Sequence, residues 1–84
     1  MICNAGIAGA PSPSDWLKTG DFEKTISVNL LGTIRTALAF KNELRRAKGR
    51  LIIVSSVYGT CNMGYNGPYS VSKYGVEALA DTLR

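Results

Sequence analysis

A run of consecutive apolar residues near the middle of the chain limits the folds that this sequence can adopt. Residues 50–57 read RLIIVSSV, and the apolar core of this segment is continuous rather than alternating. Such a strand is typical of a parallel sheet that helices cover on both faces. Residues 50–57 are therefore predicted to form a buried strand. A chain of 84 residues has room for one small domain or for part of a larger one.

The segment before this strand has the periodicity of a helix. Apolar residues recur at intervals of four, and the set comprises Phe22, Ile26, Leu30, Ile34 and Leu38. This spacing lines up one apolar face along a helix, which we expect over about 21–47. Thr19 or Asp21 can cap its start. Gly49 is predicted to end it in the left-handed conformation, which glycine adopts without strain.

A second helix is predicted after the strand. Glycines at 59, 64 and 67 indicate a loop, and Pro68 suits the first turn of a helix over about 69–84. Residues 1–3 read as the end of another strand, and residues 8–20 as a loop with a short turn at 15–17. The order of strand end, helix, buried strand, loop and helix is an α/β pattern with a parallel sheet.

Composition argues against several classes of protein. The net charge is +4, and half of the ten basic residues lie within 41–50. No aromatic residue interleaves with these charges, and cations at a helix end offset the helix dipole, so no nucleic-acid partner is expected. The absence of histidine and of a metal-like cysteine spacing argues against a zinc site. No apolar run reaches about 18 residues, so no membrane span is expected within the chain.

The stretch GPYSVSKYG at 67–75 places Tyr69 four residues before Lys73. On a helix these positions share one face, with Cβ atoms about 5–6 Å apart. At about 6 Å and an effective dielectric of ~20, an ammonium stabilises a phenolate by about 2.8 kcal/mol. Such a tyrosine can act as a general acid or base. A surface pair at a helix start explains the same spacing, and for the pair taken alone it is the stronger interpretation.

Three further features match the places where an open α/β sheet binds ligands, outside the carboxyl ends of its strands. Ser55 and Ser56 end the predicted strand, where a hydroxyl either binds a substrate oxygen or simply terminates the strand. Asn29 is a polar residue in an apolar segment, so its side chain either bridges a water to another site or bonds its own backbone on the helix flank. The Asn-Ala-Gly sequence at 4–6 follows the first strand end, where a glycine lets a ligand approach the backbone.

Together these motifs resemble the short-chain dehydrogenase/reductase family. The matching segments are NAG at 4–6, VNLLG at 28–32, GRLIIVSS at 49–56 and YSVSK at 69–73. Ser56 lies thirteen residues before Tyr69, a spacing typical of that family, which favours Ser56 over Ser55. The resemblance covers essentially the whole chain and implies a Rossmann-like doubly wound parallel sheet. Residues 1–84 would then be the central fragment of one dinucleotide-binding domain, lacking the N-terminal glycine-rich cofactor turn and the C-terminal substrate region.

The resemblance also implies a role for each site residue. Tyr69 is the catalytic acid or base, Lys73 supports it and bonds the nicotinamide ribose, and Ser56 positions the substrate oxygen. Asn29 holds a water that links Lys73 to solvent, and residues 4–6 lie beside the adenosine half of the cofactor. The cofactor is expected to be NAD or NADP, with the residue that selects between them upstream. The residues expected to bind it are Asn4, Ala5, Gly6, Tyr69 and Lys73.

The substrate class follows less directly from the same resemblance. DWL at 15–17, DF at 21–22 and SKYGVEALADTLR at 72–84 are similar to retinol and hydroxysteroid dehydrogenases. They imply an apolar alcohol or ketone, bound against Tyr58, Met63 and Tyr65 of the loop at 58–66. RRAKGRL at 45–51 is similar to 3-hydroxybutyrate dehydrogenases, which keeps that substrate and other ketones open.

The resemblance further implies a homo-oligomer that pairs through the two long helices, and membrane association only through segments outside this chain. Cys3 and Cys61 leave a disulfide open, but two reduced thiols in a reducing intracellular compartment are the simpler interpretation, either cytoplasmic or associated with the endoplasmic reticulum. The competing hypothesis is a non-catalytic chain that acts only as an association module. All four catalytic residue types are present, which favours an enzyme for the parent protein, while the 84-residue chain alone is expected to be inactive.

Overall fold

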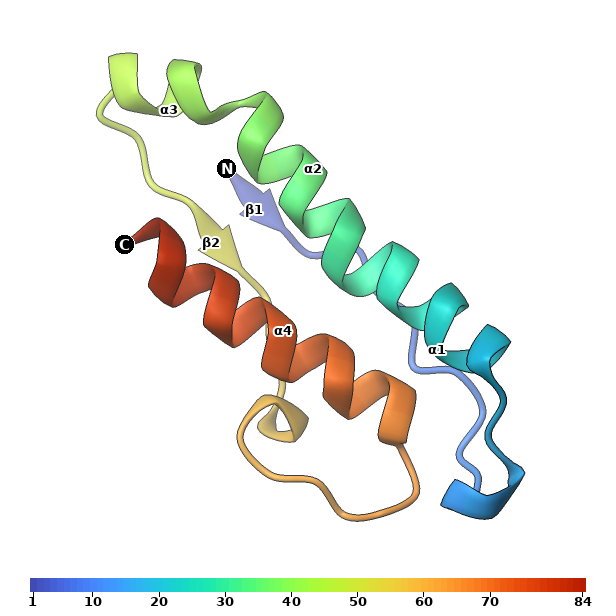
Figure 1. Cartoon of the computed structure of the whole chain (residues 1–84). Helices are drawn as coiled ribbons and strands as arrows, with labels where there is room; N and C mark the ends of the chain where they lie inside the picture. Colours follow the sequence, from blue (N-terminus) through green and yellow to red (C-terminus); the bar gives the residue numbers. More distant parts are fainter.

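The computed structural model describes all 84 residues and places two short strands beside two helical rods (Figure 1). Strand β1 (Ile2–Cys3) pairs in parallel with strand β2 (Ile52–Ile53). A backbone bond of 3.0 Å from the Val54 N–H to the Cys3 carbonyl continues the pairing beyond the ladder. Parallel neighbours require a long crossover, and here a helical rod supplies it. The predicted α/β fold with a parallel sheet is therefore confirmed.

The first helical rod lies where it was predicted but is not uniform. It comprises α1 (Thr19–Ile26), a π-helical segment (Ser27–Leu31), α2 (Gly32–Ala39) and α3 (Lys41–Arg46). In the π-helical segment the Gly32 N–H bonds the Ser27 carbonyl, five residues back instead of four. Phe40, with φ of −102° and ψ of 9°, separates α2 from α3. The predicted helix over about 21–47 thus exists, but two local departures interrupt it.

Asp21 fixes the start of α1. The N-cap position is Lys18, and its N–H donates to Asp21 Oδ2 at 2.8 Å. The carboxylate sits in the first turn, where it also faces the positive end of the helix dipole. Of the two predicted caps, Asp21 is therefore the one that acts, while the Thr19 side chain makes no hydrogen bond here.

The end of α3 corrects the predicted cap. Lys48, with φ of 48°, adopts the left-handed conformation that was assigned to Gly49. The Gly49 N–H bonds the Leu44 carbonyl at 2.8 Å and the Lys48 N–H bonds the Arg45 carbonyl at 3.2 Å, which is a Schellman motif. Gly49 comes one position later, where a Cβ atom would lie 3.2 Å from Leu44 Cδ2. The sequence therefore predicted a left-handed helix end correctly but assigned the left-handed conformation to the wrong residue.

Replacing Lys48 by glycine is expected to stabilise the protein by about 0.5–1 kcal/mol. A side chain in the left-handed region costs roughly 1–2 kcal/mol, which glycine avoids. The greater freedom of glycine in the unfolded chain offsets about half of this gain. Denaturant unfolding of the parent protein measures the change. Lys24→Gly, inside α1, is the matched control and should cost about 1 kcal/mol. No gain from Lys48→Gly would mean that residue 48 is not left-handed in solution.

The sheet has one covered face and one bare face. Cys3 is only 8% exposed, whereas Ile2, Ile52 and Val54 on the other face are 65%, 50% and 40% exposed. A strand buried on both faces was predicted, and within these 84 residues that prediction is wrong. The reason is that the helices cover one side of a sheet of only two strands.

The strand is also shorter than predicted, and the second helix is where it was expected. Ladder pairing ends at Ile53, and Ser56 already caps a 3₁₀ turn, η3 (Val57–Gly59). Helix α4 (Gly67–Leu83) carries Pro68 in its first turn, and a 3₁₀ turn at Ser14–Trp16 matches the short turn expected at 15–17. None of the helices combines the length and the apolar character that crossing a membrane would require.

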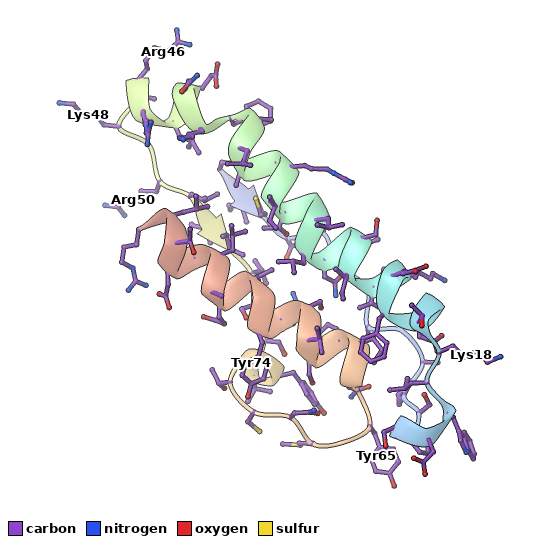
Figure 2. All side chains as sticks on the ribbon, in the orientation of Figure 1. Lys18, Arg46, Lys48, Arg50, Tyr65 and Tyr74 are labelled. Carbon is purple, nitrogen blue, oxygen red and sulfur yellow. The ribbon has the colours of Figure 1, made fainter.

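The basic cluster at residues 41–50 lies at the far end of the first rod. Arg46 and Lys48 project outward there, and Arg50 projects outward from the segment that leads into β2 (Figure 2). Arg46 pairs with Glu43 at 3.4 Å, and both side chains are largely exposed. An exposed pair of this kind contributes less than about 1 kcal/mol. The arrangement favours the interpretation of these charges as a solvated helix end.

Polar residues form most of the interior. The buried residues that are not polar are Cys3, Ala37 and Val76, together with Gly59 and Pro68. The buried polar or charged residues are Thr25, Asn29, Thr33, Ser70, Ser72 and Lys73. Buried polar groups require hydrogen-bond partners, and this requirement fixes where each of them can lie. Three of them, Asn29, Ser72 and Lys73, lie where α4 meets the π-helical segment, and they lead to the site.

Candidate active site

Tyr69 and Lys73 lie one helical turn apart on α4, as their spacing predicted. Lys73 is only 5% exposed, and its Nζ donates to the Val54 carbonyl at 2.9 Å. The same nitrogen lies 5.6 Å from the centroid of the half-buried Tyr69 ring. A surface pair at a helix start, the alternative interpretation, is therefore wrong for Lys73. The buried ammonium connects α4 to the carboxyl end of β2.

Ser56 lies three residues after the end of β2, at the cap position of η3. Its Oγ accepts the Tyr58 N–H at 3.3 Å, so its own hydroxyl proton has no partner within the chain. The Tyr58 ring meets the Tyr69 ring edge to face, with 5.8 Å between centroids. Ser56 thus caps η3 and keeps a free hydroxyl proton, two residues before the tyrosine whose ring contacts Tyr69.

Ser55 points elsewhere. Its Oγ is buried and has no hydrogen-bond partner. A Cβ atom added to Gly59 would lie 2.6 Å from this oxygen and 3.1 Å from the Lys73 carbonyl, so the chain passes close to α4 here. Ser55 therefore packs inside the loop that follows β2, and Ser56 is the serine with a hydroxyl free to meet a ligand.

Asn29 is held by residues far away in the sequence. Its Oδ1 accepts the Ile7 N–H at 2.7 Å, and its Nδ2 donates to the Ile7 carbonyl at 2.8 Å and to Ser72 Oγ at 3.0 Å. The alternative of an asparagine bonded to its own backbone on the helix flank is therefore wrong. The side chain fastens the loop after β1 to the helices, and both of its amide hydrogens are used.

The loop at residues 4–6 runs beside the same cluster. Asn4, Ala5 and Gly6 are all exposed. A Cβ atom on Gly6 would lie 3.3 Å from Asn29 Oδ1 and 3.8 Å from Lys73 Nζ. Glycine at this position therefore leaves the loop backbone open at the point where Asn29 and Lys73 approach each other.

Two contributions to the site were missed from the sequence. Ser72, which is fully buried, bonds Asn29, and the Tyr58 ring supports Tyr69. A serine inside a helix is a weak helix former that usually bonds locally, so Ser72 carried a signal. The Tyr58 contact carried none, because it depends on how η3 folds back toward α4.

A cavity of about 390 Å³ opens beside the site rather than on it. Its walls come from the loop at 7–12, from α1 and from the start of α4, and they include Asp21, Lys24 and Asn66. None of the four candidate catalytic residues lines it. The cavity is therefore separate from the candidate catalytic side chains.

The arrangement has the parts needed for proton transfer. It offers a phenol, a buried ammonium anchored behind it and a hydroxyl that can hold a substrate oxygen. No cluster of acidic residues, histidines or cysteines suited to a metal ion is present. The geometry suits an acid–base reaction at a hydroxyl or carbonyl group.

Comparison with known proteins agrees with the family resemblance seen in the sequence. The model of the short chain dehydrogenase family matches residues 1–84, so the chain belongs to the short-chain dehydrogenase family. It is 44% identical to mouse retinol dehydrogenase 16 and 43% identical to human 17-beta-hydroxysteroid dehydrogenase type 6, in each case over all of this chain and 26% of the relative. An alcohol dehydrogenase from the archaeon Thermococcus sibiricus, complexed with 5-hydroxy-NADP, superposes with a TM-score of 0.90 at 33% identity, over 96% of this chain and 34% of that one.

Proposed function

We propose that the parent protein is an NAD- or NADP-dependent oxidoreductase in which residues 1–84 supply the acid–base centre. The observation that carries this proposal is Lys73, buried to 5% exposure, bonded to Val54 at the strand end and set behind Tyr69. Burying an ammonium is costly, so a lysine held in this way indicates a use for its charge. Residues 1–84 would form the central part of one dinucleotide-binding domain.

Each candidate residue then has one task. Tyr69 takes a proton from the substrate hydroxyl during oxidation and returns it to the carbonyl oxygen during reduction. Lys73 stabilises the phenolate form of Tyr69 through its positive charge. Ser56 donates its free hydroxyl proton to the substrate oxygen. Asn29 holds a water that links Lys73 to solvent, using its carbonyl groups, because its amide hydrogens are already bonded.

The residues present fit a nicotinamide cofactor, which would accept or supply the hydride. An ammonium has three donors, and Lys73 spends one on Val54, which leaves two for the hydroxyls of a ribose. Gly6 keeps the neighbouring loop backbone free of a side chain. We assign cofactor contacts to Asn4, Ala5, Gly6, Tyr69 and Lys73.

An apolar alcohol or ketone, of retinol or steroid type, is the proposed substrate. Identity of 42–44% to several retinol dehydrogenases supports this class. The loop at 58–66 offers exposed apolar surface beside the site, with Met63 and Tyr65 at 65% and 63% exposed. A 3-hydroxybutyrate-like or other small ketone substrate would leave this surface unused.

A substrate panel tests the proposal. The parent protein is expected to reduce NAD or NADP with retinol or a hydroxysteroid, and to do so with a kcat/KM at least about tenfold higher than with 3-hydroxybutyrate. Nicotinamide absorbance follows the reaction in both directions. A preference for 3-hydroxybutyrate would overturn the apolar substrate class, and no activity with any alcohol or ketone would overturn the function itself.

Association through the two long helices is the second part of the proposal. Leu31 and Leu38 on the first rod and Val71 and Tyr74 on α4 are 40–54% exposed. Apolar side chains at these positions suit packing against the helices of a second copy. A parent protein that sediments as a monomer would contradict this arrangement.

A further inference from the structure

Ser72 makes the only side-chain hydrogen bond between the first helical rod and α4. The residue is completely buried and comes directly before Lys73 in the sequence. Its Oγ accepts the bond from Asn29 Nδ2 at 3.0 Å and donates to the Tyr69 carbonyl at 2.7 Å. One hydroxyl therefore touches the turn that carries Tyr69 and the side chain that fastens the loop after β1.

The direction of every bond in this chain is fixed by the Ile7 backbone. The Ile7 N–H can only donate and its carbonyl can only accept, so the Asn29 amide must place Oδ1 and Nδ2 as observed. The second Nδ2 hydrogen then points to Ser72 Oγ. Ser72 must accept there, which leaves its own proton for the Tyr69 carbonyl. Each donor in this chain of bonds therefore meets an acceptor, and no other orientation of the Asn29 amide would satisfy all of these groups.

This chain of bonds ends beside Lys73. Ile7 follows Gly6, and a Cβ atom on Gly6 would lie 3.3 Å from Asn29 Oδ1 and 3.8 Å from Lys73 Nζ. A shift of the Asn29 amide would therefore move both its own Oδ1 and the loop relative to the ammonium. Displacements of about 1 Å in a site of this kind are enough to lower a rate substantially.

We propose that Ser72 is a positioning residue, which holds Asn29 and the Gly6–Ile7 loop at a fixed distance from the Tyr69–Lys73 pair. The inference rests on the proposed function for its catalytic consequence. Its structural part, the link from Ser72 through Asn29 to Ile7, stands independently and has a readout of its own.

Hydrogen–deuterium exchange of the parent protein tests the structural part. Ser72→Ala is expected to speed exchange of the Ile7 amide about tenfold, because the Asn29 side chain that protects it loses one of its three partners. Exchange at Ala37, which is buried in α2 away from the site, should not change. An unchanged Ile7 amide would overturn the inference, whether or not the protein is an oxidoreductase.

A double-mutant cycle on turnover tests the catalytic part. Ser72→Ala is expected to lower kcat about tenfold in the wild-type background and less than about twofold in the Asn29→Ala background, since Ser72 acts through Asn29. Equal losses in both backgrounds would overturn the proposed path. Ser70→Ala is the matched control, because Ser70 is also buried in α4 but bonds Asn62 of the loop at 58–66. Any effect of Ser70→Ala should fall on the substrate KM and leave the cofactor KM unchanged.

Two outcomes separate this inference from the proposed function. If the wild-type protein is inactive with every alcohol and ketone while Ser72→Ala still frees the Ile7 amide, the link is real and the function is wrong. If Ser72→Ala does not fold, Ser72→Cys takes its place, since the thiol nearly keeps the volume but bonds weakly. The same exchange and turnover results are expected from that variant.

Discussion

The Tyr69→Phe variant of the parent protein is expected to lose turnover by about 10²- to 10⁴-fold, the usual contribution of a positioned acid or base. The substitution removes one hydroxyl and keeps the ring, so the edge-to-face contact with Tyr58 remains. Lys73 keeps its bond to Val54 and its two free donors. The other four assigned cofactor contacts also remain, so cofactor affinity should change by less than about threefold. Steady-state kinetics and a titration with NAD and NADP measure the two quantities.

Tyr74→Phe is the matched control for this variant. Tyr74 lies on the same helix, five residues further on, and is 45% exposed (Figure 2). Its loss of a hydroxyl should leave kcat at the wild-type value. Turnover by Tyr69→Phe comparable to that of the control would contradict the assignment of Tyr69 as acid or base.

The sequence was sufficient for the features that depend on local pattern. The spacing of apolar residues predicted both helices, because side chains at intervals of four share a helix face wherever the helix packs. The spacing also predicted that Tyr69 and Lys73 face the same side of α4, and the order of elements predicted a parallel sheet. The family resemblance identified Asn29 and Ser56 as candidate site residues together with Tyr69 and Lys73.

Features that depend on distant contacts were not predictable from the same pattern. Asn29 bonds residues 22 and 43 positions away, and the π-helical segment that carries it has the same apolar spacing as an α-helix. The left-handed residue is Lys48 although a glycine follows one position later, and the local pattern does not distinguish these two positions. The bare face of the sheet arises because the helices of these 84 residues cover only the other face, and the apolar run of the strand does not show which of its faces they cover.

Replacing Lys73 by methionine is expected to separate activity from stability. Methionine is similar in length and lacks the charge, so kcat should fall by about 10²-fold or more, and the cofactor KM should rise because the free donors are gone. The Val54 carbonyl loses its partner, which costs roughly 1–3 kcal/mol. The variant also no longer buries an ammonium at 5% exposure, and this gain offsets the loss. The free energy of unfolding should therefore stay within about 1 kcal/mol of wild type.

Two further variants decide whether geometry or charge alone explains the effect of Lys73→Met. Lys73→Arg keeps the positive charge, but its planar guanidinium replaces a compact ammonium in a buried position. Its turnover should therefore be as low as that of Lys73→Met. Lys41→Met, at the exposed start of α3, removes the same charge from the surface and should leave turnover and stability unchanged. Wild-type turnover in Lys73→Arg would mean that a positive charge at this position is sufficient for activity. A loss of stability in Lys73→Met that parallels the loss of activity would make Lys73 a structural residue, because a catalytic ammonium is retained at a cost to folding while a structural one contributes to it.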